Sequence, residues 1–134
     1  ISQPLLGEDA GLLAGVDSSI LSRTPIQPLA STVSFVIGKV RLQTGREIAV
    51  VSLRLTPPPF RSDLWNPECW RAYRDQRILQ RDELRTLSRR LTELPADLPL
   101  IVGGDFNVNP RDPIFRELPP RLRDAFTSAG AGWG

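Results

Sequence analysis

Apolar residues, many of them Val, Ile and Phe, are concentrated in two segments, 32–42 and 46–55, and these residues predict two β-strands. Gln43-Thr44-Gly45 lies between them and predicts a short hairpin loop, in which glycine can adopt a positive φ. In the second segment both alternating sets of side chains are largely apolar. We therefore expect this strand to lie in the centre of a sheet that is covered on both faces.

Apolar residues recur at spacings of three and four residues from about Pro67 to Leu94, and this pattern predicts a long helix. Its apolar face also contains Arg77 and Gln80, which either pair with other polar groups or lie at an exposed edge of that face. A second row at i+4 spacing, Arg81, Arg85 and Arg89, predicts a solvated outer face.

The remaining segments give shorter signals. Residues 1–14 have no clear period and predict a loop with at most one helical turn, whereas Ser18–Leu21 and Leu98–Val102 predict short strands. A helical turn is expected over Ile114–Leu118. Successive strands, a long helix and a further strand predict an α/β protein with a layered sandwich architecture.

The most informative motif is Ile101-Val-Gly-Gly-Asp-Phe-Asn107, at the end of the last predicted strand. In an extended segment, residues i and i+2 point to the same side, so Asp105 and Asn107 would project together. A carboxylate can accept and an amide can donate a hydrogen bond, so this pair suits a reacting polar group. The alternative is a strand that ends in a turn, because Gly, Asp and Asn are common turn residues.

Four elements in order resemble the endonuclease/exonuclease/phosphatase superfamily, whose members are metal-dependent phosphoesterases related to pancreatic deoxyribonuclease. The elements span about residues 15–134 and are Ser19-Ile-Leu-Ser-Arg-Thr-Pro-Ile26, Glu47-Ile-Ala-Val-Val-Ser-Leu-Arg-Leu55, Arg77-Ile-Leu-Gln80 with the leucines after it, and Gly104-Asp-Phe-Asn107 with its proline loop. The resemblance implies a deoxyribonuclease-like α/β sandwich of mixed, mainly antiparallel sheets. It also implies that residues 1–134 are part of a single such domain, incomplete at both ends.

The resemblance also implies roles for individual residues. Asp105 would orient or deprotonate the attacking water, and Asn107 would donate a hydrogen bond to a phosphoryl oxygen. Arg23 and Arg77 are candidates for substrate contact. The cofactor implied is Mg²⁺, with Mn²⁺ as a possibility, and the expected metal ligands lie outside this sequence.

One departure from the family pattern concerns Arg54, which stands where the family usually has histidine. Arginine is a permanent cation that can bind a phosphoryl oxygen but cannot shuttle a proton near neutral pH. Two interpretations stay open: an active hydrolase in which Arg54 contributes to catalysis, and a catalytically inactive domain that binds a phosphorylated ligand.

The amino-acid composition indicates the class of protein. The net charge is only +2, and 40% hydrophobic with 24% charged residues are typical of a soluble globular protein. The chain has no methionine, so we expect an internal piece of a longer protein.

The substrate would be a nucleic acid, a phospholipid head group or a small phosphodiester, and no obligate protein partner is indicated. Trp65 and Trp70 either stack on such a substrate or cap a hydrophobic core.

Overall fold

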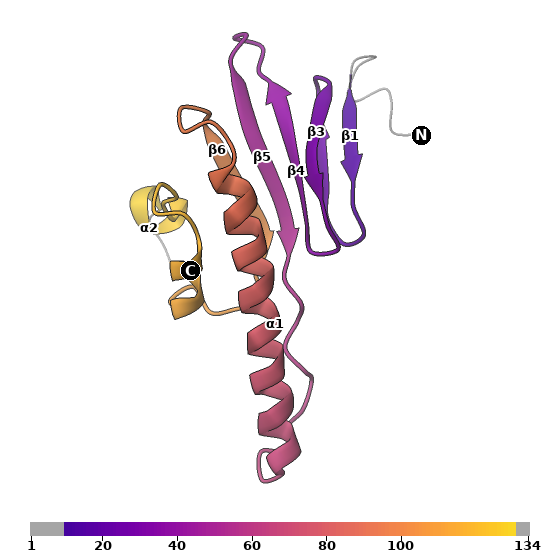
Figure 1. Ribbon diagram of the computed structural model, residues 1–134, viewed down its shortest axis with the longest axis vertical. Helices are drawn as coiled ribbons and strands as arrows, with labels where there is room; N and C mark the ends of the chain where they lie inside the picture. The colour runs from indigo at the N-terminus through magenta and orange to yellow at the C-terminus, as the bar shows by residue number, and fades with distance from the viewer. Residues whose placement is uncertain (1–9, 131–134) are drawn as a thin grey trace. The chain divides into compact units, whose positions relative to one another are not determined.

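The computed structural model describes residues 10–130, which form two compact units (Figure 1). Of the described residues, the first unit contains residues 10–57 and 94–107. The second contains residues 58–93 and 108–130. Within the described residues, no helix is long and apolar enough to span a membrane.

The main element of the first unit is a four-stranded sheet with the order β3-β4-β5-β6. Its strands are β3 (Ile26–Ser31), β4 (Phe35–Arg41), β5 (Glu47–Arg54) and β6 (Leu100–Asp105). The predicted hairpin between β4 and β5 is confirmed, and Gly45 in its loop has a φ of 81°. The predicted central position of β5 is also confirmed, because β5 pairs antiparallel with β4 and parallel with β6.

A smaller antiparallel sheet is formed by β1 (Gly11–Ala14) and β2 (Ser19–Ser22). It packs on the four-stranded sheet at Gly38, where an added Cβ would lie 3.2 Å from Leu13 and 3.6 Å from Ile20. The prediction of a loop for residues 1–14 is therefore wrong for residues 11–14. Pairing with β2 makes this segment extended, and such pairing leaves no local period to detect. Residues 1–9 lie outside the described part.

Strand β3 has no counterpart among the predicted elements. It contains Pro28, which cannot donate a ladder hydrogen bond and which normally argues against a strand. Here β3 is an edge strand with a bulge between Pro28 and Ala30, and these are the positions at which a sheet tolerates proline.

The second unit contains α1 (Pro67–Thr92), the 3-10 helix η2 (Pro113–Glu117) and α2 (Ala125–Ala129). Helix α1 confirms the predicted helix, and its N-terminus is capped by the Asn66 side chain, which accepts a hydrogen bond from the backbone N–H of Glu68. The apolar face that was predicted is buried at Leu84, Leu87 and Leu91.

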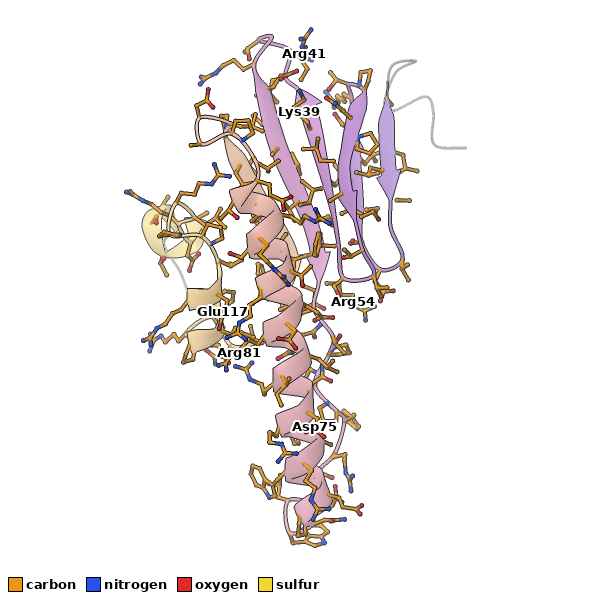
Figure 2. All side chains as sticks on the ribbon, in the orientation of Figure 1. Lys39, Arg41, Arg54, Asp75, Arg81 and Glu117 are labelled. Carbon is orange, nitrogen blue, oxygen red and sulfur yellow. The ribbon has the colours of Figure 1, made fainter. Side chains whose placement is uncertain are left out.

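The arginine row of α1 is solvated, as predicted, and it also makes contacts that were not predicted. Arg81 and Arg85 both form ion pairs with Glu117 of η2, at 3.3 Å and 3.0 Å, and Figure 2 shows Arg81 beside Glu117. Both arginines remain about half exposed, so this face is solvated and also attaches η2 to α1.

Candidate functional site

The carboxyl ends of β5 and β6 bring two predicted site residues together. The two strands are parallel, and Arg54, the last residue of β5, is in register with Asp105, the last residue of β6. The pairing continues one step further, because the backbone N–H of Leu55 donates to the Asp105 carbonyl at 2.9 Å. The carboxylate and the guanidinium therefore stem from adjacent positions at one end of the sheet, although they are 51 residues apart in sequence.

Strand β6 extends further than predicted, because both glycines lie inside it. Gly104 has a φ of 142°, a backbone conformation that L-residues rarely adopt. A Cβ at this position would lie 1.9 Å from the carbonyl oxygen of Leu53 on β5. Only glycine allows β6 to stay this close to β5 directly before Asp105, so Gly104 determines where the carboxylate is positioned.

Asn107 also lies at this end of the sheet. A turn places it there, and not the alternation of side chains along a strand. Its φ is 50°, in the left-handed region that asparagine tolerates better than most residues. Its backbone N–H donates to Asp105 Oδ1 at 3.1 Å, and its side-chain Nδ2 donates to the Leu55 carbonyl at 2.8 Å. Asp105 and Asn107 are joined by this hydrogen bond, but the predicted strand alternation does not place them: β6 ends at Asp105 in an Asx-type turn, which is the alternative that the sequence analysis gave.

A fourth group at this end, the carboxylate of Asp17, was not predicted from the sequence. Arg54 Nη1 lies 3.7 Å from Asp17 Oδ1, and the two side chains are 46% and 47% exposed. Ion pairs as exposed as this contribute little to stability, so an incoming anion can displace the carboxylate at small cost. Asp17 lies in the turn between β1 and β2, and no local sequence pattern links it to Arg54.

Arg23, a predicted substrate contact, lies at the opposite end of the sheet. It follows β2 directly, and the hydroxyl of the next residue, Thr24, donates to the Arg41 carbonyl at 2.8 Å. Arg41 is in register with Glu47 at the start of β5, whereas Arg54 is at its end. Figure 2 shows Arg41 and Arg54 at opposite ends of the sheet. The structure does not bring Arg23 together with Arg54, Asp105 and Asn107.

Arg77, the second predicted substrate contact, belongs to the second unit and is held by two polar partners there. Its guanidinium donates to Gln80 Oε1 at 3.0 Å and to Asp112 Oδ1 at 2.6 Å. Gln80 is buried, at 1% exposed, so pairing accounts for its place on this helix face, whereas the Arg77 side chain is paired and also 41% exposed. The same Asp112 oxygen caps η2 by accepting from the N–H of Ile114 at 2.9 Å.

The surroundings of Asp112 determine its charge state. Partial burial raises the pKa of its carboxyl, but the hydrogen bonds from the Ile114 N–H and from Arg77 lower it more, so that the pKa lies below 3.8. Asp112 is therefore ionised near neutral pH. The Asp112-Pro113 dipeptide is a recognisable helix-start signal in the sequence, whereas its pairing with Arg77 requires the fold.

The described residues offer no ready-made metal centre. No group of three or more His, Cys, Asp or Glu side chains among residues 10–130 is arranged to hold a metal ion. A cavity of about 510 Å³ lies in the first unit, near the start of β5, and its lining includes Lys39, Arg46, Glu47 and Asp97. It contains none of the predicted site residues. We place the candidate site at the Arg54–Asp105 end, because the acceptor, donor and cation lie together there.

Comparison with known proteins gives the family. The sequence pattern of the Endonuclease/Exonuclease/phosphatase family matches residues 13–134. The chain belongs to this family. No curated protein sequence matches the chain closely enough to count as a relative.

Two solved structures of beta toxin from Staphylococcus aureus resemble the fold. One is the F277A, P278A mutant with bound magnesium ions, with a TM-score of 0.55 and 19% identity over 75% of this chain. The other is described as beta toxin 275-280, with a TM-score of 0.54 and 20% identity over 74% of this chain. This likeness and the mixed sheets confirm the predicted deoxyribonuclease-like α/β fold. The chain covers 36% of each toxin chain.

Proposed function

We propose that this chain is part of a metal-dependent hydrolase of phosphate esters, with its reaction centre at the carboxyl ends of β5 and β6. The observation that carries the proposal is the meeting of Arg54, Asp105 and Asn107 at one end of the sheet. Family membership supports it, since the family comprises endonucleases, exonucleases and phosphatases. The proposal includes the expectation that residues 1–134 form part of one such domain.

Each of the three residues has a role that fits its chemistry. The Asp105 carboxylate accepts a proton or a hydrogen bond from the attacking water, because an ionised carboxylate is an acceptor. Asn107 supplies an amide donor to a phosphoryl oxygen as negative charge builds there. Arg54 exchanges its weak ion pair with Asp17 for the phosphoryl group, which a guanidinium can bind through two parallel hydrogen bonds.

Mg²⁺ dependence is a further part of the proposal. The described residues contain no cluster that could hold the ion alone. Mg²⁺ in enzymes is often bound by one or two carboxylates together with waters and substrate phosphate. Support also comes from the beta toxin structure with bound magnesium ions. We assign no reaction step to the metal from the residues of this chain.

The substrate is proposed as a class only: a phosphate ester from nucleic acid, a phospholipid head group or a small phosphodiester. Arg54 favours a phosphate group as the recognised element, because its planar fork matches phosphate oxygens. Arg77 stays a proposed substrate contact, and its guanidinium is held by hydrogen bonds to Gln80 Oε1 and Asp112 Oδ1.

The experiment that tests the proposal measures hydrolysis of bis-p-nitrophenyl phosphate and p-nitrophenyl phosphate by the full-length protein, with Mg²⁺ and with EDTA. The proposal predicts metal-dependent turnover that falls by about 10²–10⁴ in Asp105→Ala and by about 10²–10³ in Asn107→Ala. If the protein binds a phosphate ester in the presence of EDTA and shows no turnover at any Mg²⁺ concentration, the result would instead support the other interpretation, a catalytically inactive domain that binds a phosphorylated ligand.

A further inference from the structure

The carboxylate of Asp17 extends from a turn that is held against the four-stranded sheet. The backbone N–H of Gly15 donates to the Ser18 carbonyl at 2.8 Å and closes this turn between β1 and β2. An added Cβ at Gly15 would lie 2.6 Å from Val36 Cγ1, so the turn contacts β4 closely. The Ser18 hydroxyl oxygen is buried in the turn, whereas the Asp17 side chain is 47% exposed. The fold therefore holds a solvent-accessible carboxylate beside Arg54.

The charges at this end of the sheet do not balance. In the described part of the first unit, Arg54 is the only cation at the carboxyl ends of β5 and β6, and the carboxylates of Asp17 and Asp105 lie beside it. The remaining charged side chains described in this unit lie toward the opposite end of the sheet, where Figure 2 labels two of them; they are Arg23, Lys39, Arg41, Arg46, Glu47 and Asp97. One positive and two negative charges give the candidate site a net charge of −1 near neutral pH.

The charge of a phosphate ester depends on its class. A phosphodiester carries one negative charge, whereas a phosphomonoester ionises a second time with a pKa of about 6 and carries nearly two negative charges above neutral pH. An ester that binds the Arg54 guanidinium also comes close to Asp17, because Arg54 Nη1 lies 3.7 Å from Asp17 Oδ1. The Asp17 carboxylate therefore repels a bound monoester more strongly than a bound diester.

We propose that Asp17 is a specificity-determining residue, which makes this site favour phosphodiesters over phosphomonoesters. The proposal rests on the proposed function and narrows its substrate class. Repulsion by Asp17 differs from simple competition for Arg54, because competition weakens the binding of both esters equally. Two unit charges about 6 Å apart in a half-exposed site change binding about three- to tenfold at low ionic strength, and this is the preference that Asp17 supplies.

The test compares kcat/KM for bis-p-nitrophenyl phosphate and p-nitrophenyl phosphate in the full-length wild type and in Asp17→Asn, at pH 8, low salt and one Mg²⁺ concentration. Differences in the intrinsic reactivity of the two esters cancel when the two proteins are compared, and so does the charge of any bound metal. We expect Asp17→Asn to lower the diester-to-monoester ratio of kcat/KM about three- to tenfold. High salt should reduce this change.

Two variants serve as controls. Asp97→Asn removes the same charge from an exposed residue in the lining of the cavity near the start of β5, and it should leave the ratio unchanged. Asp17→Glu keeps the negative charge in the turn and should keep most of the preference for the diester. Together these variants separate a local effect of the Asp17 charge from an effect of the net charge of the protein.

A binding measurement separates failure of this proposal from failure of the proposed function. Calorimetric titration of the full-length protein with diphenyl phosphate and with phenyl phosphate, both in EDTA, requires no turnover. We expect Asp17→Asn to strengthen the binding of phenyl phosphate about three- to tenfold more than that of diphenyl phosphate. Absence of hydrolysis together with this binding result would refute the proposed function alone. The specificity proposal is overturned if Asp17→Asn changes both anions equally, if the wild type binds neither anion, or if Asp97→Asn shifts the ratio as much as Asp17→Asn.

Discussion

Replacing Gly104 by alanine should both destabilise the protein and displace its proposed catalytic carboxylate. The added Cβ would lie 1.9 Å from the Leu53 carbonyl oxygen and 2.8 Å from the Leu53 carbonyl carbon and amide nitrogen. All three are backbone atoms of β5, so no flexible side chain can move aside. Strand β6 must shift away from β5, and Asp105, the next residue, must move with it.

The loss in the free energy of unfolding follows from two energetic costs. A non-glycine residue held at a φ of 142° costs about 1–3 kcal/mol, and overpacking against a neighbouring backbone costs about 1–3 kcal/mol more. The free energy of unfolding should therefore fall by about 2–6 kcal/mol. With a urea m-value of about 2 kcal/mol/M, this corresponds to a decrease of about 1–3 M in the unfolding midpoint.

Gly103 supplies a matched control one residue away in the same strand. A Cβ there would meet nothing within 4 Å, so Gly103→Ala should change stability by less than about 1 kcal/mol. The assay is urea unfolding of both full-length variants, with phosphoesterase activity measured in parallel. Equal unfolding midpoints for the two variants would refute the argument that close backbone approach requires glycine at position 104.

The remaining predictions concern two carboxylates. Asp112→Ala removes both the cap on Ile114 and the hydrogen bond to the part-exposed Arg77, and it should cost about 2–3 kcal/mol in thermal or urea unfolding. Because folding lowers the pKa of Asp112, its stabilisation is present above pH 3.8 and is lost as the pH falls below that value. Asp112→Asn should flatten this acid limb of the stability profile, and an unchanged limb would contradict the assignment. Asp17→Asn frees Arg54 from its competing carboxylate and should lower KM for a phosphate ester about two- to fivefold without changing the free energy of unfolding by more than about 1 kcal/mol. An unchanged KM would argue against phosphate binding by Arg54.

Much of the fold could be predicted from local patterns. The hairpin around Gly45 was found because two segments rich in Val, Ile and Phe flank a short loop that contains glycine, and helix α1 was found because its apolar residues recur at spacings of three and four. Strands β1 and β3 were missed although each pairs with the next strand along the chain, because neither segment has a local residue pattern typical of a strand. In β3, Pro28 argues locally against a strand, and only its edge position with a bulge makes it acceptable.

The residues of the candidate site could be predicted from the sequence, but their arrangement could not. Asp105 and Asn107 were found from their spacing and from the family motif, and Arg54 from its place where the family usually has histidine. Their meeting depends on the parallel register of β5 and β6, which the sequence does not encode locally. The distant position of Arg23 and the pairing of Arg77 with Asp112 likewise follow from tertiary contacts.

The most direct test of the central claim is the turnover rate of Asp105→Asn in the full-length protein, measured with Mg²⁺ on a phosphodiester substrate. This change keeps the size and the oxygen that can accept from the Asn107 N–H, but it removes the negative charge. The account predicts that kcat falls by about 10²–10⁴ while the unfolding midpoint stays nearly the same. A variant that retains wild-type kcat would contradict the proposal that Asp105 activates water at the end of β6.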